Sequence, residues 1–175
     1  GDLWVFAYGS LLWDPALAFA EVRRAFAPNH ARRFILRDIY GGRGTEDAPG
    51  LMAALDDGSG CAGLAFRIAP DQVEAETDIL FRRELLGPGY FARFVPIEIA
   101  EERIEALCFI ADHSIDMIAS DLTREDQIAC FLTGTGFLGS SYDYLANVVE
   151  HLHEMGIPDP ELDALKAEVD ARRGA

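Results

Sequence analysis

The stretch that decides the fold is Leu3-Trp4-Val5-Phe6-Ala7, followed directly by Tyr8-Gly9-Ser10-Leu11. The first five residues are bulky and apolar, and such a run predicts a buried strand. Gly9 interrupts the run, because glycine permits a sharp turn and a close approach of the backbone. After this interruption the backbone N–H groups of residues 10–12 are expected to face a ligand, so the turn predicts a cradle for an anion. The alternative is an ordinary turn that ends a strand.

The composition predicts one globular domain spanning residues 1–175. Half of the 175 residues are apolar and a tenth are aromatic, which is enough for a proper core. The net charge of −15 and the pI near 4.5 argue against nucleic acid as a partner. Phosphate backbones require clustered Lys and Arg, and the sequence has no such cluster. An anionic substrate would approach against this field, so its site must supply local donors.

The sequence also predicts where the protein works. No apolar run reaches the roughly 20 residues of a membrane span, so no membrane association is expected. A positively charged start followed by an apolar signal core is not seen either. Cys61, Cys108 and Cys130 are widely spaced, odd in number and set in apolar segments. This pattern favours buried free thiols in a reducing compartment, and therefore a cytoplasmic location.

The order of the expected elements predicts the fold class. Strands are expected at 3–7, 21–27, 30–40, 51–55, 63–68, 90–100 and 103–111. Residues 41–50 are expected to form a loop, while 56–60 and 101–102 are expected to be the turns of two hairpins. One helix at 71–86 interrupts the strands, and helices at 124–132, 141–155 and 161–173 follow them. The prediction is an α+β fold: a small mixed, largely antiparallel β-barrel with one inserted helix and a C-terminal helical segment.

Glu84 is the most informative carboxylate in the sequence. On a helix of 3.6 residues per turn it shares one face with Val73, Thr77 and Leu80, so a charged residue continues an apolar stripe. It also lies in the last turn, where the helix dipole disfavours an anion and raises its pKa. Arg82 and the arginine after it are expected to point to other faces. A partly buried general base is one interpretation, and a solvated glutamate at a fraying helix end is the other.

Other motifs are weighed and set aside. The segment 134–139 matches the dinucleotide-binding pattern Gly-x-Gly-x-x-Gly, but it follows a helix and is interpreted as a loop between helices. The four histidines have no metal-ligand spacing, so neither a metal nor another cofactor is expected. Arg43, between two glycines, is either a structural guanidinium or a carboxylate clamp. Tyr142 and Tyr144 cannot face the same way on one helix, so at least one of them is expected in the core.

The string from Trp4 to Trp13 resembles the opening motif of the gamma-glutamylcyclotransferase superfamily, in the form typical of its ChaC-type branch. Further blocks extend this resemblance in the same order along nearly the whole chain. They are Arg43-Gly44-Thr45 with Pro49-Gly50-Leu51, the segment 61–67, the segment 80–90, and Asp143-Tyr144-Leu145 with the leucines that follow it. An Asn often seen in the loop before Tyr142 is replaced here by the Ser140-Ser141 region.

The resemblance implies the superfamily's small mixed barrel and an enzyme that converts glutathione into 5-oxoproline and cysteinylglycine. It places Glu84 where the family carries its catalytic glutamate. It also implies substrate-binding residues at Ala7, Tyr8, Gly9, Ser10, Leu11, Leu12, Arg43 and Tyr144.

The implied chemistry suits these residues. A gamma-glutamyl group carries an α-amine that can attack its own γ-carbonyl, so nucleophile and electrophile are already in one molecule. One carboxylate can take the proton from the amine and give it to the leaving group. No metal, nucleotide or covalent intermediate is required. Two alternatives stay open: a cyclotransferase for another gamma-glutamyl amine or dipeptide, and a non-catalytic gamma-glutamyl-binding or regulatory protein. The oligomeric state is not predicted.

Overall fold

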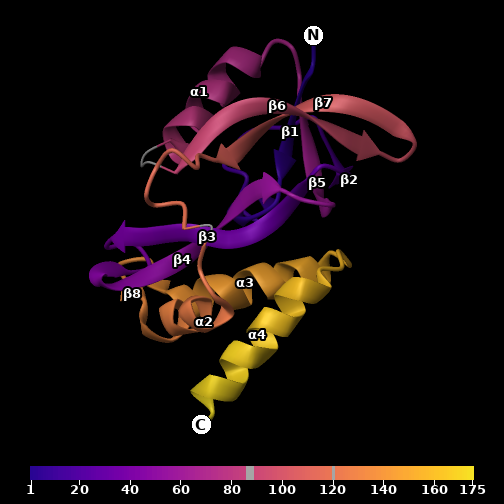
Figure 1. The fold of residues 1–175 in the computed structure, drawn as a ribbon. Helices are drawn as coiled ribbons and strands as arrows, with labels where there is room; N and C mark the ends of the chain where they lie inside the picture. The colour runs from indigo at the N-terminus through magenta and orange to yellow at the C-terminus, as the bar shows by residue number, and fades with distance from the viewer. Residues whose placement is uncertain (86–88, 120) are drawn as a thin grey trace. The chain divides into compact units, whose positions relative to one another are not determined.

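The computed structural model describes residues 1–85, 89–119 and 121–175 (Figure 1). The chain forms two compact units, which are described in turn. The barrel unit comprises residues 1–33 and 54–115, and the helical unit comprises residues 34–53 and 116–175. Strands β3 (His30–Tyr40) and β4 (Thr45–Asp57) have residues in both units. That residues 1–175 act as a single domain stays a prediction.

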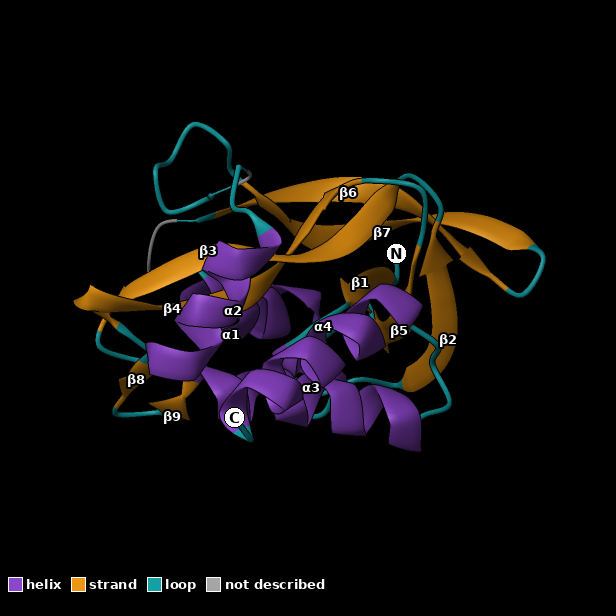
Figure 2. Ribbon diagram, turned by 60° about the horizontal axis from the view of Figure 1, so that its bottom comes forward, coloured by secondary structure: helices purple, strands orange, loops and turns teal. Residues whose placement is uncertain are grey.

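The barrel unit is built around a ring of five strands (Figure 2). In their order around the ring, they are β1 (Leu3–Ala7), β5 (Cys61–Ile68), β2 (Glu21–Ala27), β6 (Tyr90–Ile99) and β7 (Glu102–Ala111). Neighbouring strands are antiparallel, and the ring closes where β1 pairs in parallel with β7, with Val5 opposite Leu107. The predicted small, mixed, largely antiparallel barrel is therefore confirmed.

The bulky apolar run at residues 3–7 forms β1, the strand at which this ring closes. Strand β1 pairs on both edges, and its residues Val5, Phe6 and Ala7 are fully buried. A strand with neighbours on both sides and core on its faces needs a continuous apolar sequence. Strand β2 shows the other pattern, since Ala25 and Ala27 are buried while the residue between them is exposed. That alternation is expected for a strand with one face in solvent.

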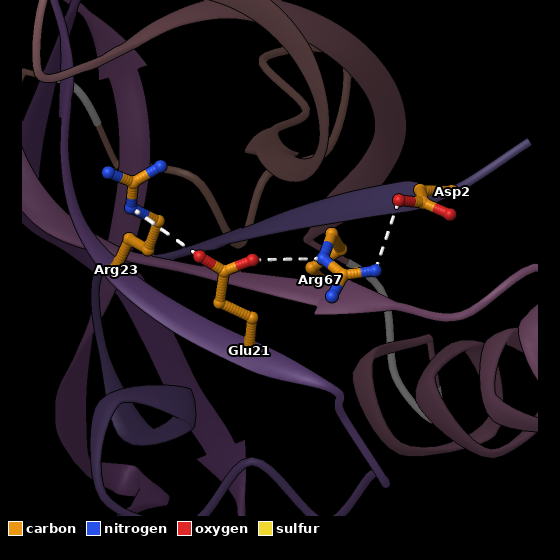
Figure 3. A network of polar contacts seen from close by, with 4 residues as sticks. All are labelled: Asp2, Glu21, Arg23 and Arg67. Atoms are coloured by element: carbon orange, nitrogen blue, oxygen red, sulfur yellow. Dashed lines mark hydrogen bonds and ion pairs between the residues drawn. The ribbon is translucent and has the colours of Figure 1, made fainter.

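A network of ion pairs lies on the surface where the chain enters β1 (Figure 3). Arg67 donates Nε–H to Glu21 at 3.0 Å and an Nη1–H to Asp2 at 3.1 Å. Glu21 also lies 3.6 Å from Arg23. Because Glu21 and Arg67 are direct partners across β2 and β5, the network supports this strand register.

Helix α1 (Val73–Glu84) is the inserted helix of the barrel unit. It begins two residues later than predicted, because residues 70–72 form a turn in which Gln72 N–H bonds to Ala69. Glutamates at 74 and 76 lie in its first turn and arginines at 82 and 83 in its last, which complements the helix dipole. The predicted end of the helix at Leu86 and the Gly87-Pro88 stop signal lie outside the described residues.

The prediction of a loop over residues 41–50 is wrong for its second half. The tight turn is confined to 41–44, where Gly41 N–H bonds to Gly44, and β4 begins at Thr45. Close backbone packing explains the glycines at 44 and 50. A Cβ on Gly44 would lie 2.0 Å from the backbone nitrogen of Gly50, so neighbouring backbones approach too closely for a side chain. Gly44 and Gly50 thus mark a close approach of the turn to β4, and the second half of the stretch is a strand and not a loop.

The predicted hairpin around residues 56–60 is also wrong. Within the described ranges, β4 pairs with β7 and β3, whereas β5 pairs with β1 and β2. The turn bonds instead to the start of β3, with Gly58 N–H on Asn29 and Gly60 N–H on His30. The β6–β7 hairpin is confirmed, but Ile99 faces Glu102, so the turn residues are 100–101 and not 101–102.

The helical unit carries α2 (Arg124–Thr133), α3 (Ser141–Glu154) and α4 (Pro160–Arg173). Each begins at an oxygen-bearing cap, at Thr123, Ser140 and Asp159 respectively. The loop predicted at 134–139 contains a small hairpin of β8 (Thr135–Gly136) and β9 (Gly139–Ser140). Among the described helices, none is both long and apolar enough to cross a membrane.

Candidate functional site

The turn after β1 is a single 3-10 turn, η1 (Ser10–Leu12). Leu12 N–H bonds to Gly9 at 2.9 Å and Trp13 N–H to Ser10 at 3.3 Å. Gly9 has a φ of −131°, so glycine is not required here for a left-handed conformation. The predicted interruption of the strand at Gly9 is confirmed.

This turn leaves backbone donors unused. The first N–H groups of a helical turn have no partner within it. Among the residues that the structure describes, the N–H groups of Gly9, Ser10 and Leu11 make no hydrogen bond. Gly9 and Leu11 are buried, and buried N–H groups are nearly always paired in proteins. The unused donors are those of residues 9–11 and not 10–12, because Leu12 N–H closes the turn. They make the turn a suitable cradle for a negatively charged oxygen.

The residues just before the turn are held firmly. Ala7 is fully buried and faces Leu64 across β1 and β5. Tyr8 is buried and donates its hydroxyl proton to the carbonyl oxygen of Phe109 at 2.7 Å. The side chains of both residues are therefore part of the barrel core.

Glu84 ends helix α1, and only 14% of its side chain is exposed. It follows Leu80, which is buried, on the face that the sequence predicted. Burial raises the pKa of the Glu84 carboxyl group, while Arg83, whose Nε lies 3.7 Å from Oε1, opposes this rise. The predicted partial burial is confirmed, and the pKa shift has the predicted direction, with burial and not the helix dipole as the cause found here. A carboxyl group with a raised pKa suits proton transfer near neutral pH.

Arg83 links the end of α1 to the turn. Its guanidinium donates to Ser10 Oγ at 3.3 Å and to the carbonyl oxygen of Asp14, and it lies 3.7 Å from the Asp14 carboxylate. Helical spacing predicted only that Arg83 points to a face other than that of Glu84, and it did not predict these contacts. The long side chain reaches a segment about 70 residues earlier, which periodicity within one helix cannot reveal. The residue next to Glu84 thus contacts the turn that carries the unused donors.

Arg43 and Tyr144 lie together in the helical unit. Arg43 donates a guanidinium N–H to the carbonyl oxygen of Ser140 at 3.2 Å, and its Cζ lies 5.8 Å from the Tyr144 ring centre. Tyr144 is 8% exposed, and its hydroxyl oxygen accepts the N–H of Ala53 at 3.2 Å. The prediction that Tyr142 or Tyr144 packs in the core is confirmed for Tyr144. A substrate contact of Arg43 or Tyr144 stays a prediction.

Several buried polar residues were missed by sequence reasoning. Asp38 accepts the backbone N–H groups of Tyr40 and Arg43 and so shapes the turn between β3 and β4. Glu76 accepts the N–H of Ala18 at 2.8 Å. The partner of Glu76 lies 58 residues away in the sequence, so no local signal marks this position, whereas the partners of Asp38 are local, at two and five residues' distance.

The cysteines and acidic residues offer no second site in the ranges described. Cys61 and Cys108 are buried, and burial raises the pKa of the Cys108 thiol well above its usual range. A protonated thiol is a poor nucleophile. Across residues 1–85, 89–119 and 121–175, no group of three or more His, Cys, Asp or Glu side chains has a geometry that could hold a metal ion.

The comparison with protein families decides the classification. The family described as "ChaC-like protein" matches residues 3–172 of this chain. The chain belongs to the ChaC-like family. The "Glutathione-specific gamma-glutamylcyclotransferase" of Escherichia coli (strain K12) is 34% identical over 171 residues, which cover 97% of this chain and 73% of that protein. The human "Glutathione-specific gamma-glutamylcyclotransferase 1" is 30% identical over 174 residues, which cover 97% of this chain and 78% of that protein.

Solved structures agree with this family assignment at the level of the fold. A crystal structure of a glutathione-specific gamma-glutamyl cyclotransferase from yeast matches with a TM-score of 0.86. The match covers 97% of this chain and 96% of the yeast chain at 21% identity. The ChaC-like chain therefore has the fold of this cyclotransferase.

Proposed function

We propose that this chain is a glutathione-specific gamma-glutamylcyclotransferase, an enzyme that converts glutathione into 5-oxoproline and cysteinylglycine. The observation that carries the proposal is a largely buried glutamate whose neighbouring arginine contacts a donor-rich turn. Glu84 has a raised pKa, and the adjacent Arg83 contacts the turn whose N–H groups at residues 9–11 are unused. Membership of the ChaC-like family and the names of its relatives support the same reaction.

The reaction joins two atoms of one substrate. The α-amine nitrogen of the gamma-glutamyl group attacks the γ-carbonyl carbon, and the amide bond to the cysteine nitrogen breaks. The products are the five-membered lactam of 5-oxoproline and the free amine of cysteinylglycine. Because the reaction is intramolecular, binding the substrate in a folded conformation supplies much of the rate acceleration.

Glu84 is the proposed proton carrier. It takes a proton from the attacking amine and returns it to the nitrogen of the leaving cysteinylglycine, so no proton is gained or lost overall. A carboxylate in water is a weak base for this purpose. Burial raises the pKa of Glu84 and so brings it closer to the pH at which the enzyme works.

The turn after β1 is the proposed site for the oxygen of the reacting carbonyl. This oxygen gains negative charge as the amine attacks, and fixed backbone N–H groups stabilise such charge strongly. The donors at Gly9, Ser10 and Leu11 are available for it. The proposal also includes substrate contacts by other residues, namely Ala7, Tyr8, Leu12, Arg43 and Tyr144. A structure of the complex with bound 5-oxoproline would test these contacts. The proposed cytoplasmic location is supported by Cys61 and Cys108, which are buried and not joined in disulfides.

The test is incubation of the purified chain with glutathione and detection of 5-oxoproline and cysteinylglycine by mass spectrometry. A panel of other gamma-glutamyl amines and dipeptides is assayed in parallel. The proposal predicts both products from glutathione and much slower turnover of the panel. Faster turnover of a panel member would make this a cyclotransferase of another specificity. Binding of glutathione without product would make it a non-catalytic gamma-glutamyl-binding protein.

A further inference from the structure

We infer that Arg32 is a positioning residue that holds the peptide between Tyr8 and Gly9 in the orientation the reaction needs. The inference rests on the proposed function. Arg32 lies near the start of β3 within the barrel unit, and its side chain is partly buried. No feature of its sequence position marks it as functional.

Two hydrogen bonds of Arg32 go to backbone carbonyls. Its Nε–H donates to the carbonyl oxygen of Tyr8, and an Nη2–H donates to that of Ala62, both at 2.6 Å. These carbonyls lie just past the point where Ala7 faces Leu64, at the end of the pairing between β1 and β5. Hydrogen bonds from a guanidinium are stronger than those between neutral groups, and its fork shape fixes their direction.

The bond to Tyr8 sets the direction of a neighbouring donor. A trans peptide unit is planar, and its C=O and N–H point in opposite directions. When Arg32 holds the carbonyl of Tyr8, the N–H of Gly9 must point away from Arg32. This N–H is one of the donors for which the described residues provide no acceptor. Arg32 therefore fixes the orientation of one of the three donors proposed to bind the reacting carbonyl.

Glycine at position 9 makes such a restraint necessary. Rotation of the Tyr8–Gly9 peptide by about half a turn would bring φ of Gly9 from −131° into the positive range, which glycine adopts readily. The carbonyl oxygen of Tyr8 would then take the place of the N–H of Gly9 and repel a negatively charged oxygen. The rest of Tyr8 is anchored independently, by its hydroxyl bond to Phe109 and by the β1–β5 pairing beside it. Loss of Arg32 should thus free the peptide plane more than it disturbs the strand.

The next residue offers a matched control. Arg33 donates to the carbonyl oxygen of Asp57 at 3.3 Å in an exposed position. The experiment compares wild type, Arg32→Ala, Arg32→Lys and Arg33→Ala by steady-state kinetics on glutathione, with circular dichroism to measure the folded fraction. Loss of one donor to a developing oxyanion typically lowers kcat about a hundred- to a thousandfold. We expect kcat of Arg32→Ala to fall at least about tenfold while KM stays within about twofold, since part of the population keeps the correct orientation. Arg32→Lys, which keeps a charged donor, should recover part of the loss, and Arg33→Ala should match wild type.

Several results would overturn the inference. They are an unchanged kcat in folded Arg32→Ala, an equal loss in Arg33→Ala, or a rise in KM with no loss of kcat. If Arg32→Ala does not fold, the same comparison is made with Arg32→Lys and Arg32→Gln, and full activity of both would reject the role. A wild-type chain that releases no 5-oxoproline from any gamma-glutamyl substrate would instead refute the proposed function, which separates the two failures.

Discussion

The same substitution should have opposite effects on stability at two glutamates of helix α1. Glu84 is largely buried, and burial raises the pKa of its carboxyl group, whereas Glu76 accepts a hydrogen bond from the N–H of Ala18 at 2.8 Å. Glutamine keeps the shape of both side chains and removes the charge. We therefore expect Glu84→Gln to raise the Tm at pH 7 and Glu76→Gln to lower it.

The size of the first effect follows from the raised pKa of Glu84. Each unit of pKa difference between the folded and unfolded states corresponds to about 1.4 kcal/mol. A change of 1 kcal/mol shifts the Tm of a chain of this size by about 2–4 °C. Removal of the buried charge should thus raise the Tm by roughly 3–5 °C for each unit of pKa shift.

The size of the second effect follows from the bond to Ala18. Hydrogen bonds to charged groups contribute about 1.5–3 kcal/mol and neutral ones about 0.5–1.5 kcal/mol. Since the glutamine amide oxygen can still accept this N–H, Glu76→Gln should cost about 1 kcal/mol, or about 2–4 °C in Tm.

The pH dependence of the Tm tests whether the buried charge of Glu84 causes the first effect. Because the pKa of Glu84 is higher in the folded state than its ordinary value of 4.5, the unfavourable term is absent below pH 4.5 and grows as the pH rises through the folded-state pKa. The assay is thermal unfolding followed by circular dichroism from pH 4 to pH 8, for wild type and both variants. The stabilisation by Glu84→Gln should disappear toward pH 4. A lower Tm for Glu84→Gln at pH 7, or a gain that persists unchanged at pH 4, would refute the reasoning.

Two further predictions concern stability elsewhere in the chain. Ser141 is fully buried, and its hydroxyl accepts the N–H of Leu51 at 2.9 Å and donates to the carbonyl oxygen of Leu51 at 3.2 Å. Ser141→Ala removes both of these buried hydrogen bonds and should lower the free energy of unfolding in urea by about 1–3 kcal/mol, so an unchanged unfolding midpoint would contradict this role. His30 is buried, and its Nδ1 has no partner among the described residues. Burial lowers the pKa of His30 below 6.5; the charge of Arg93 acts in the same direction, and the charges of Asp57 and Asp56 act against it. The stability that neutral His30 contributes is therefore complete above pH 6.5 and is lost as the pH falls toward the folded-state pKa. His30→Gln should make the Tm depend less on pH between pH 7 and pH 5. An equally steep dependence in the variant would contradict this prediction.

The sequence predicted the local features of the site well. The apolar run before Tyr8 identified the strand that closes the barrel, because a strand paired on both edges, with its last three residues fully buried, requires an uninterrupted apolar sequence. Gly9 marked the end of that strand. The placement of Glu84 on an apolar helix face predicted its burial, and its position in the last turn predicted the direction of its pKa shift.

Most features that the sequence did not predict depend on how segments pack together. Glycines at 44 and 50 carry the signal of a loop, yet they allow the turn at 41–44 and strand β4 to approach closely. The turn at 56–60 carries the signal of a hairpin, although its flanking strands pair with other partners. Arg83 and Arg32 act through backbone carbonyls and side chains far away in sequence. Periodicity reports which face of an element is buried and not what that face contacts.

The central claim is that Glu84 carries the proton in the release of 5-oxoproline from glutathione. The most direct test measures the initial rate of 5-oxoproline formation by wild type, Glu84→Gln and Glu76→Gln, at a temperature where all three are folded by circular dichroism. General acid–base catalysis contributes about a hundred- to ten-thousandfold, so Glu84→Gln should lose at least about a hundredfold in kcat. Glu76→Gln removes one negative charge from the same helix and should retain the wild-type rate. A folded Glu84→Gln enzyme with near-wild-type turnover would contradict the claim.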